Sequence, residues 1–469
     1  MATILDAMTD PRLFGDSFGG DSFAGWRALL AGFYGLDLDD AQLAVWKALT
    51  GRKDAPQGPH NELWLAVGRR GGKSHAAALI AVYEACFRDH RAKLAKGEMA
   101  TVMLLAADRK QARTLSRYVR GFITEHPMLR QMVKNETADG IELTNRTVIE
   151  IGTASHRSVR GYTTAAVICD EIAFWMADGA SPDVEILAAL RPSLATLGGK
   201  LIALSSPYAR RGALWNTYRR CFGNDDPRTL VAQAPSRTMN PTLRQSVIDD
   251  AFREDPARAA AEYMAEFRTD IASLIAPQLL EDAIRAKPVV KPRMKGERYF
   301  AFCDPSGGGP DEFTLAIGHM EGRRKDGSRI IVDALYGQHG SPAQTVRTFA
   351  DILETYGINR VTGDRYAGRW PRDEFLRWGI RYEPSEMDRS ALYIELLAAL
   401  NSGRVEIPPD DTTRRQMLSL ERRTGSSGRD VIDHPPGGHD DRANAVAGLV
   451  AHTDMKARRS VTRAKIVGL

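Results

Sequence analysis

The sequence has little of what defines several common classes of protein. Its 469 residues include only four cysteines, which lie far apart and form no Cys-x-x-Cys pair. This spacing argues against a zinc site or a disulfide framework and suits a reducing cytosol. The chain has no apolar run of about 18 residues, the length that a membrane-spanning helix needs, and its N-terminus lacks the pattern of a signal peptide. We therefore expect a cytoplasmic protein that is not secreted and has no membrane partner.

An excess of charge of one sign is also missing. Lys and Arg number 64 against 59 Asp and Glu, which gives a net charge of +5. This mild excess is compatible with a polyanionic partner but does not require one. The fractions of hydrophobic (43%) and charged (26%) residues are ordinary, and the chain carries no internal repeat or low-complexity segment. These values exclude wholesale disorder and fibrous classes, and the length allows several globular domains.

The first half of the chain has the pattern of an α/β domain. An apolar run at 63–67 meets a glycine-rich segment, and an alanine-rich helical stretch follows at 75–87. Further apolar runs alternate with helical patterns at 101–106, 147–151, 165–169 and 200–204. This alternation is typical of a mostly parallel sheet covered by helices. We expect one such domain at 1–270.

The second half predicts a different α/β domain. Prolines and basic residues mark 271–297 as a linker. After it, three successive strands at 298–304, 313–319 and 329–335 favour antiparallel pairing, and later short strands alternate with helices. The last helix is expected to end near residue 455. We therefore expect a mixed-sheet domain at 298–455 and a basic tail at 456–469.

The glycine-rich segment predicts a phosphate-binding loop. Gly68, Gly71 and Gly72 free the backbone N–H groups to point inward, Lys73 meets the β- and γ-phosphates, and Ser74 binds Mg²⁺. The usual pattern has its first glycine one position earlier than here, so the loop is irregular. The alternative is a glycine-rich turn with an incidental lysine.

Two acids and two hydroxyls follow later apolar strands. Asp170 is suited to hold Mg²⁺ through water, and Glu171 to orient or deprotonate an attacking water. Ser205 and Ser206 end another strand and are suited to sense the γ-phosphate. The alternative for the acids is a solvated pair at the end of a strand.

Phosphoryl transfer also needs a cation near the transferred group. Arg157 and Arg160, upstream of the acids, are candidates, as are Arg69 and Arg70 within the loop. Each of these arginines is equally compatible with a solvated or DNA-facing position.

A second set of acids lies in the C-terminal half. Asp304 and Asp364 end strands, and Asp440 and Asp441 begin the last helix. This strand, strand, helix layout is ribonuclease H-like and suits two-metal cleavage of a phosphodiester. Asp440 shares a helix face with Asn444, so we favour it as the ligand, with Asp441 second. Any one of these acids is also compatible with a capping or turn role.

These motifs together resemble the large terminase subunit of tailed bacteriophages. The segments that carry the resemblance are the irregular loop at 68–74, Val-Ile-Cys-Asp-Glu at 167–171, Ser-Ser-Pro at 205–207 and Gly-His-Asp-Asp-Arg-Ala-Asn at 438–444. The resemblance spans nearly the whole chain. It implies a P-loop ATPase of the ASCE type that drives double-stranded DNA into a procapsid, joined to an endonuclease that cuts concatemeric DNA.

The resemblance also implies roles for single residues and for partners. Gln42 falls where the family has an adenine-reading glutamine, although a surface helical glutamine is as compatible, and Arg160 matches an arginine that acts in trans. Asp304, Asp364 and Asp440 would be metal ligands, and Asn444 stands where some relatives carry a further carboxylate. The implied cofactors are ATP and Mg²⁺, with Mn²⁺ as an alternative nuclease metal. The implied partners are the portal protein, a small terminase subunit and four further copies in a ring of five.

Two other functions fit the same motifs. One is a repair or restriction helicase fused to a nuclease, which would separate the strands of a fork. The other is a DNA-binding assembly factor whose ATPase and nuclease sites are degenerate, which the irregular loop suggests.

Overall fold

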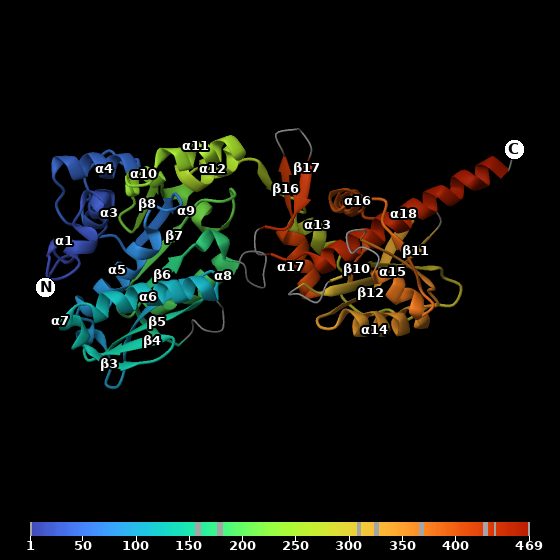
Figure 1. The fold of residues 1–469 in the computed structure, drawn as a ribbon, viewed down its shortest axis with the longest axis horizontal. Helices are drawn as coiled ribbons and strands as arrows, with labels where there is room; N and C mark the ends of the chain where they lie inside the picture. The colour runs from blue at the N-terminus through green and yellow to red at the C-terminus, as the bar shows by residue number, and fades with distance from the viewer. Residues whose placement is uncertain are drawn as a thin grey trace. The chain divides into compact units, whose positions relative to one another are not determined.

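The computed structural model of the chain forms two compact units, Met1–Thr269 and Asp270–Leu469 (Figure 1). The structure describes residues 2–154, 161–175, 182–306, 311–322, 328–364, 370–424, 430–435 and 438–467, with the backbone alone at 182, 424 and 456–467. Both units are α/β, which confirms the fold class that the sequence predicts.

The sheet of the first unit has the order β3-β4-β5-β2-β6-β7-β1-β8. Its strands are β1 (Glu62–Val67), β2 (Ala100–Ala106), β3 (Val133–Glu136), β4 (Gly140–Leu143), β5 (Thr147–Thr153), β6 (Thr163–Asp170), β7 (Lys200–Ser205) and β8 (Thr229–Ala234). All pairs from β5 to β8 are parallel, and the pairs that join β3, β4 and β5 are antiparallel. The strand β7 lies between β1 and β6, so the two motif-bearing strands are separated by one added strand, as in the predicted ASCE-type ATPase fold.

Helices cover both faces of this sheet. The helices of the first unit are α1 (Ile4–Thr9), α2 (Gly15–Phe18), α3 (Ala24–Phe33), α4 (Asp40–Thr50), α5 (Lys73–Cys86), α6 (Arg109–Thr124), α7 (Pro127–Arg130), α8 (Pro182–Leu190), α9 (Gly212–Cys221), α10 (Ser236–Met239), α11 (Gln245–Glu254) and α12 (Pro256–Met264), with 3-10 turns η1 (Asp21–Phe23), η2 (Arg91–Lys93), η3 (Ile172–Phe174) and η4 (Arg191–Leu194). Buried side chains of α3, α5 and α6 pack on one face of the sheet, and those of α8 and α9 pack on the other.

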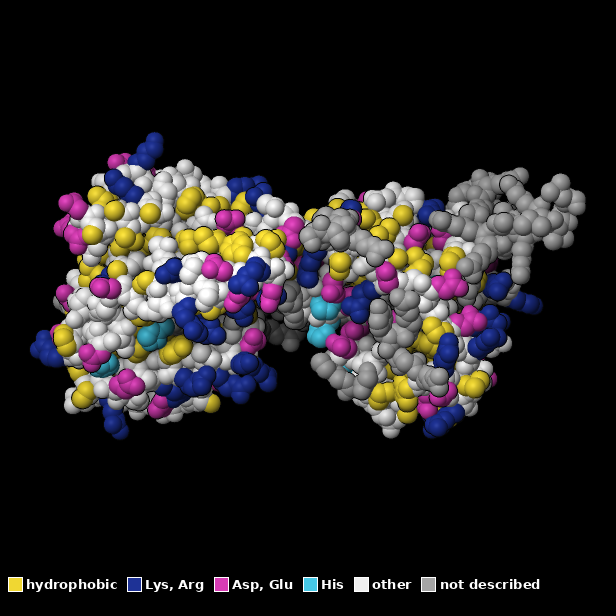
Figure 2. Space-filling view, turned by 45° about the horizontal axis from the view of Figure 1, so that its top comes forward, with side chains coloured by type: hydrophobic (Ala, Val, Ile, Leu, Met, Phe, Trp, Pro, Cys, Tyr) yellow, Lys and Arg dark blue, Asp and Glu magenta, His cyan; other side chains and the backbone are white. Residues whose placement is uncertain are grey.

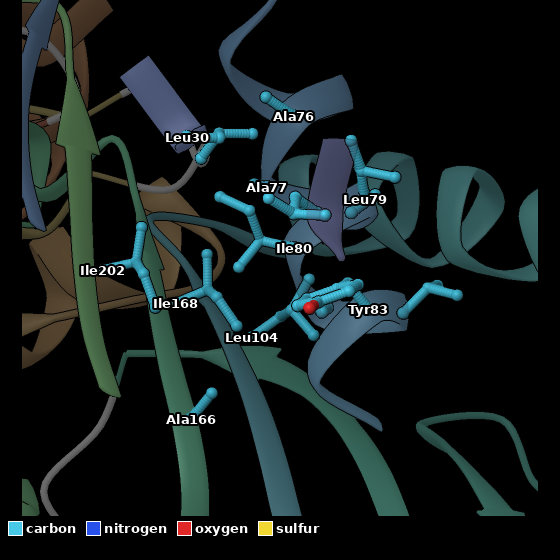
Figure 3. Close-up of a cluster of buried hydrophobic side chains, with 14 of the residues drawn as sticks. Leu30, Ala76, Ala77, Leu79, Ile80, Tyr83, Leu104, Ala166, Ile168 and Ile202 are labelled. Atoms are coloured by element: carbon cyan, nitrogen blue, oxygen red, sulfur yellow. The ribbon is translucent and has the colours of Figure 1, made fainter. Parts of the chain in front are cut away.

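The alanine-rich helix α5 lies at the centre of the first core. Alanine favours the helix and is small enough to bring its backbone close to the sheet. Figure 3 shows side chains of α5 facing side chains of the strands: Ile80 points toward Ile168 and Leu104, and Tyr83 lies beside Leu104. This packing fixes the start of α5, and with it the glycine-rich loop, relative to the ends of β1, β6 and β7.

The second unit contains a six-stranded mixed sheet with the order β14-β13-β10-β11-β12-β15. Its strands are β10 (Tyr299–Asp304), β11 (Phe313–Glu321), β12 (Arg329–Gln338), β13 (Arg360–Gly363), β14 (Arg381–Pro384) and β15 (Val405–Glu406). The first three pair antiparallel, as predicted, and β13, β14 and β15 join in parallel. This mixed sheet agrees with the predicted ribonuclease H-like class.

Helices again lie on both faces. They are α13 (Pro277–Glu281), α14 (Pro342–Thr355), α15 (Trp370–Arg377), α16 (Arg389–Asn401), α17 (Asp411–Ser419) and α18 (Asp441–Val467). Helices α16 and α18 pack on one face of the sheet, and α14 and α15 on the other. The helix α18 runs to Val467, although we expected a tail after residue 455. Lys and Arg, which fill this stretch, are good helix formers and do not stop a helix.

The segment 271–297, expected to be a linker, contributes to the second unit. It contains α13 and a short strand, β9 (Ile271–Ser273), which pairs with β16 (Glu421–Thr424) beside β17 (Asp430–Asp433). Ile275 and Leu280 are buried in the core of this unit. Pro277 does not interrupt α13, because proline is tolerated in the first turn of a helix.

Within the described residues, no helix is both long enough and apolar enough to span a bilayer.

Candidate functional site

The glycine-rich loop joins β1 to α5 at the carboxyl edge of the sheet. Gly72 immediately precedes α5 and has a φ of 83°, a left-handed conformation that glycine adopts without steric cost. Lys73 is the first residue of the helix, and its side chain is only 6% exposed. The Lys73 ammonium donates to the carbonyls of Val67 (3.1 Å) and Gly68 (3.4 Å). The loop therefore curls around the lysine, as a phosphate cradle requires.

The same ammonium connects the ends of three strands. Lys73 Nζ lies 2.8 Å from Ser206 Oγ, after β7, and 3.3 Å from Glu171 Oε1, after β6. In a nearly buried setting, an ammonium and a carboxylate interact much more strongly than in water. The structure thus brings together three residues that are far apart in the sequence and that we predicted for one site.

Glu171 is held in a fixed and unusual position. Its φ of 51° is left-handed, which costs energy for a residue other than glycine. Its second carboxylate oxygen accepts hydrogen bonds from Ser205 Oγ (2.9 Å) and from the Ser206 backbone N–H (3.0 Å). Backbone strain of this kind clusters at functional sites, where the surrounding contacts offset it.

Asp170 differs from its neighbour in its environment. Ser74 Oγ donates to Asp170 Oδ2 at 3.0 Å, and the buried Asp170 Oδ1 has no hydrogen-bond partner in the described part of the chain. Burial, together with the nearby charge of Glu171, raises the pKa of Asp170 to about 7. A hydroxyl beside an unsatisfied carboxylate oxygen is a donor set that Mg²⁺ prefers. These residues therefore fit the predicted metal.

Other residues predicted for the nucleotide site have contacts or backbone conformations of their own. The side-chain carbonyl of Gln42 accepts from the backbone N–H of Asp39 (3.1 Å) in a capping box at the start of α4, which is a structural role. Arg69 forms an ion pair with Glu262 at 3.1 Å, and Arg70 has a left-handed φ of 65°.

Both upstream arginines, Arg157 and Arg160, lie outside the described residues.

The second candidate site surrounds Asp304 at the end of β10. Asn444 Nδ2, on α18, donates to Asp304 Oδ2 at 2.8 Å, and Asn444 Oδ1 is buried without a partner among the described residues. Burial raises the pKa of Asp304 to about 7 against the lowering effect of the Asn444 hydrogen bond, and the charges of Asp364, Asp441 and Asp440 act in the same direction as burial. The predicted acids therefore share one electrostatic environment, which a divalent cation would neutralise.

The acids at the start of α18 have different partners. Asp440 immediately precedes the helix, and its Oδ2 accepts from the hydroxyl of Tyr393 (2.7 Å) and lies 3.5 Å from Arg389. Neither Tyr393 nor Arg389 belongs to a motif that marks it in the sequence. Asp441 Oδ2 accepts from the backbone N–H of Glu312 at 3.1 Å, and burial raises the pKa of Asp441.

One cluster in this region has the spacing of a metal site. Ligand atoms of Asp311, His439 and Asp441 lie within 4.8 Å of one another, the one such trio in the described chain. His439 Nδ1 and Asp311 Oδ1 are 2.9 Å apart. No local motif joins Asp311 to His439, because only the fold brings the 311 loop to the start of α18.

The fold and the two sites define the class: a P-loop ATPase-like unit and a ribonuclease H-like unit on one chain. No family model and no curated protein matches the chain. Among solved structures, the large terminase of bacteriophage HK97 is similar at 14% identity and a TM-score of 0.40, over 91% of this chain and 99% of that one.

Two further structures are similar. One is the large terminase of the thermophilic bacteriophage D6E in complex with ADP, at 15% identity and a TM-score of 0.38, over 86% of this chain and 97% of that one. The other is the large terminase nuclease of the thermophilic phage G20c, at 20% identity and a TM-score of 0.32, over 38% of this chain and 96% of that one. At these scores the likeness carries no weight alone, so the proposed function rests on the positions of the site residues.

Proposed function

We propose that the chain is a large terminase subunit, which uses ATP to move double-stranded viral DNA into a procapsid and cuts concatemeric DNA. The observation that supports this proposal is the presence of two separate groups of the predicted residues on one chain. Lys73 contacts Glu171 and Ser206 in the first unit, and the second unit holds a buried Asp304 among further acids.

The first unit is proposed to hydrolyse ATP. Lys73 and the loop N–H groups would bind the phosphates, and Ser74 and Asp170 would hold Mg²⁺, which would supply positive charge to offset that of the phosphates. Glu171 accepts a proton from the attacking water, and Lys73 and the Ser205 and Ser206 donors hold its carboxylate in place. Loss of the γ-phosphate changes what Ser206 contacts, which couples hydrolysis to movement at the end of β7.

The second unit is proposed to cut DNA. Asp304, Asp364, and either Asp440 or Asp441 would hold Mg²⁺ or Mn²⁺, which when bound polarises the phosphate and activates water. Asn444 and Tyr393 orient two of these carboxylates through the hydrogen bonds described above. Figure 2 shows histidine and acidic side chains gathered at one place on the surface of this unit.

The proposed partners follow from the proposed activity. They are double-stranded DNA, the portal protein, a small terminase subunit and further copies of the chain in a ring of five, in which Arg160 acts on a neighbouring copy. The work would take place in the bacterial cytoplasm. On the face shown in Figure 2, basic side chains are dispersed among acidic ones on both units, so no single stripe marks a DNA path.

Phosphate release and strand separation test this proposal against its rivals. We expect the intact protein to hydrolyse ATP in the presence of linear duplex DNA, and the Lys73→Ala variant to be inactive. We expect no strand separation on a forked duplex. Strand separation would favour the helicase-nuclease, and absence of phosphate release by the wild type would favour the assembly factor.

A further inference from the structure

Three successive carbonyl groups of the glycine-rich loop each accept a hydrogen bond from a side chain outside the loop. The bonds run from Ser236 Oγ to the Arg69 carbonyl (2.6 Å), from Asn240 Nδ2 to the Arg70 carbonyl (2.9 Å) and from Trp26 Nε1 to the Gly71 carbonyl (2.8 Å). The donors come from distant parts of the sequence, because Trp26 lies on α3 and the other two begin and follow α10.

The orientation of Asn240 is fixed by a further residue. Its Oδ1 accepts from the backbone N–H (3.2 Å) and the hydroxyl (2.6 Å) of Thr242, so its NH₂ group is the one that faces the loop. Trp26 is fully buried, and its indole N–H meets the Gly71 carbonyl inside the core. These are built contacts rather than chance approaches of mobile surface groups.

These bonds determine which way the loop's N–H groups point. In a trans peptide the C=O of one residue and the N–H of the next point in opposite directions. Donors that hold the carbonyls of residues 69–71 therefore turn the following N–H groups away from α3 and α10. Of these, the Gly71 N–H donates to the Gly68 carbonyl within the loop (3.1 Å), so it is the N–H groups of Arg70 and Gly72 that the donors turn toward a phosphate. Inward-facing backbone N–H groups are what bind phosphate. The Lys73 ammonium donates to the two preceding carbonyls, those of Val67 and Gly68. The carbonyls of residues 67 and 68 thus face Lys73, and those of residues 69–71 face the donors outside the loop.

The loop conformation needs such support. Arg70 has a φ of 65°, a conformation that is unfavourable for a residue with a side chain. The bond from Asn240 reaches the carbonyl of Arg70 itself. The Asn240 side chain thus holds the loop at Arg70, where the residue's own backbone preference opposes the left-handed conformation that the loop adopts.

The contact from Ser236 also explains the irregular position of the first glycine. A Cβ atom at Gly68 would lie 2.4 Å from Ser236 Oγ and 2.7 Å from Ser236 N. Any larger residue at this position would push Ser236 away from the loop. The shifted glycine is therefore a condition for the Ser236 contact, which gives its position a structural reason.

We propose that Trp26, Ser236 and Asn240 form a carbonyl clamp, a set of positioning residues that holds the loop in its phosphate-binding conformation before nucleotide arrives. The clamp touches neither substrate nor reacting atoms, and it rests on the proposed ATPase function. Because it acts on the conformation that binds phosphate, its loss raises KM and leaves kcat at saturating ATP nearly unchanged.

The test measures binding of Mg²⁺-tripolyphosphate by calorimetry and ATP hydrolysis by phosphate release, with the full-length protein. The variants are Trp26→Phe, Ser236→Ala and Asn240→Ala, singly and combined. We expect each single change to weaken tripolyphosphate binding and raise KM by about 3- to 10-fold, the effect of one hydrogen bond. The three effects are expected to accumulate in the triple variant to about 30-fold or more.

Two matched controls separate the clamp from general effects. Trp46→Phe removes an indole N–H bond to another backbone carbonyl, that of Asp54 (3.2 Å), away from the loop. Asn224→Ala removes a side-chain amide that donates to another backbone carbonyl, that of Arg220 (2.6 Å), away from the loop. Both controls are expected to bind tripolyphosphate as the wild type does.

The outcomes distinguish the clamp from the function on which it rests. Wild-type binding in all three single variants overturns the clamp, as does an equal loss in Trp46→Phe or a fall in kcat without a rise in KM. Failure of the wild type itself to bind either Mg²⁺-ATP or Mg²⁺-tripolyphosphate overturns the ATPase proposal and the clamp with it. The partly exposed Asn240 keeps the test usable even if a change at the buried Trp26 prevents folding.

Discussion

Two adjacent carboxylates in the first unit, Asp170 and Glu171, occupy different environments. Asp170 is buried, has one oxygen without a partner and has its pKa raised to about 7. Glu171 contacts the Lys73 ammonium and accepts two hydrogen bonds. Neighbouring acids in unlike environments take unlike roles, as is common in active sites. The positions favour Asp170 as the metal residue and Glu171 as the base.

The Glu171→Gln substitution tests this division of roles. The amide retains the size of the side chain and an acceptor for Ser205 and Ser206, but it cannot take a proton. We expect ATP to bind and phosphate release to fall by about 100- to 10,000-fold, the usual contribution of a general base. Filter binding of ATP and phosphate release measure the two effects. Turnover at the wild-type rate would refute the role, and Glu142→Gln, at an exposed ion pair with Lys134, serves as the control.

A second buried pair predicts how stability depends on pH. His319 and Asp333 are buried in the second unit, with His319 Nδ1 2.6 Å from Asp333 Oδ2. Burial lowers the pKa of His319, but the hydrogen bond and charge of Asp333 outweigh burial, so the pKa is raised from 6.5. A raised histidine pKa stabilises the fold fully below the unfolded pKa, and this stabilisation is lost as pH rises through the folded pKa.

The free energy of unfolding should therefore fall as pH rises above 6.5, by about 1.4 kcal/mol for each pH unit up to the folded pKa of His319. Urea unfolding of the wild type and of Asp333→Asn at several pH values measures the difference. Subtracting the variant removes the contribution of other titrating groups. A difference that stays constant or grows with pH would show that His319 is not charged in the folded state.

At the scale of elements, the contact between α18 and β10 builds the second site. The helix brings Asn444 to Asp304 because its backbone approaches the strand closely at Gly448. A Cβ atom at Gly448 would lie 2.4 Å from the ring of Phe302. Gly448 has an ordinary helical backbone, so its conformation does not require glycine. The close approach to Phe302 is what requires a residue without a Cβ atom.

The Gly448→Val substitution should push α18 away from β10. We expect the second unit to lose about 1–3 kcal/mol of stability, which is typical of overpacking, and DNA cleavage to fall while ATP hydrolysis is retained. Calorimetric melting and the two activity assays measure these effects. Gly58→Val is the control, because a Cβ atom at Gly58 meets nothing within 4 Å. Cleavage at the wild-type rate in Gly448→Val would contradict the importance of this contact.

Elements with a strong local pattern could be predicted from the sequence, and elements made by distant contacts could not. The apolar runs before Gly68 and Asp170 are strands, and Lys73 begins a helix, because their side-chain periodicity is local. The strand β9 has three residues and exists only because it pairs with β16, about 150 residues later.

The site residues divide in the same way. The motifs identified Lys73, Glu171 and Ser206, which meet in the structure. Trp26 and Asn240 have no motif, and their contacts with the loop depend on how α3 and α10 pack. The sequence predicts that Gln42 lies on a helix, but its capping hydrogen bond with Asp39 depends on the local backbone geometry.

At the scale of the whole molecule, each of the two units has its own core and its own candidate site. The groups proposed for ATP hydrolysis all lie before Thr269, and those proposed for DNA cleavage all lie after Asp270. The account therefore predicts two chemistries that can be removed one at a time by single substitutions. This separation is its central claim.

The most direct test runs two assays on three proteins: the wild type, Lys73→Ala and Asp304→Ala. The assays are ATP hydrolysis and cleavage of supercoiled plasmid in Mg²⁺ and in Mn²⁺. We predict that Lys73→Ala cuts DNA without hydrolysing ATP, and that Asp304→Ala hydrolyses ATP without cutting DNA. Cleavage by Asp304→Ala at the wild-type rate, or no cleavage by the wild type with either metal, would contradict the account.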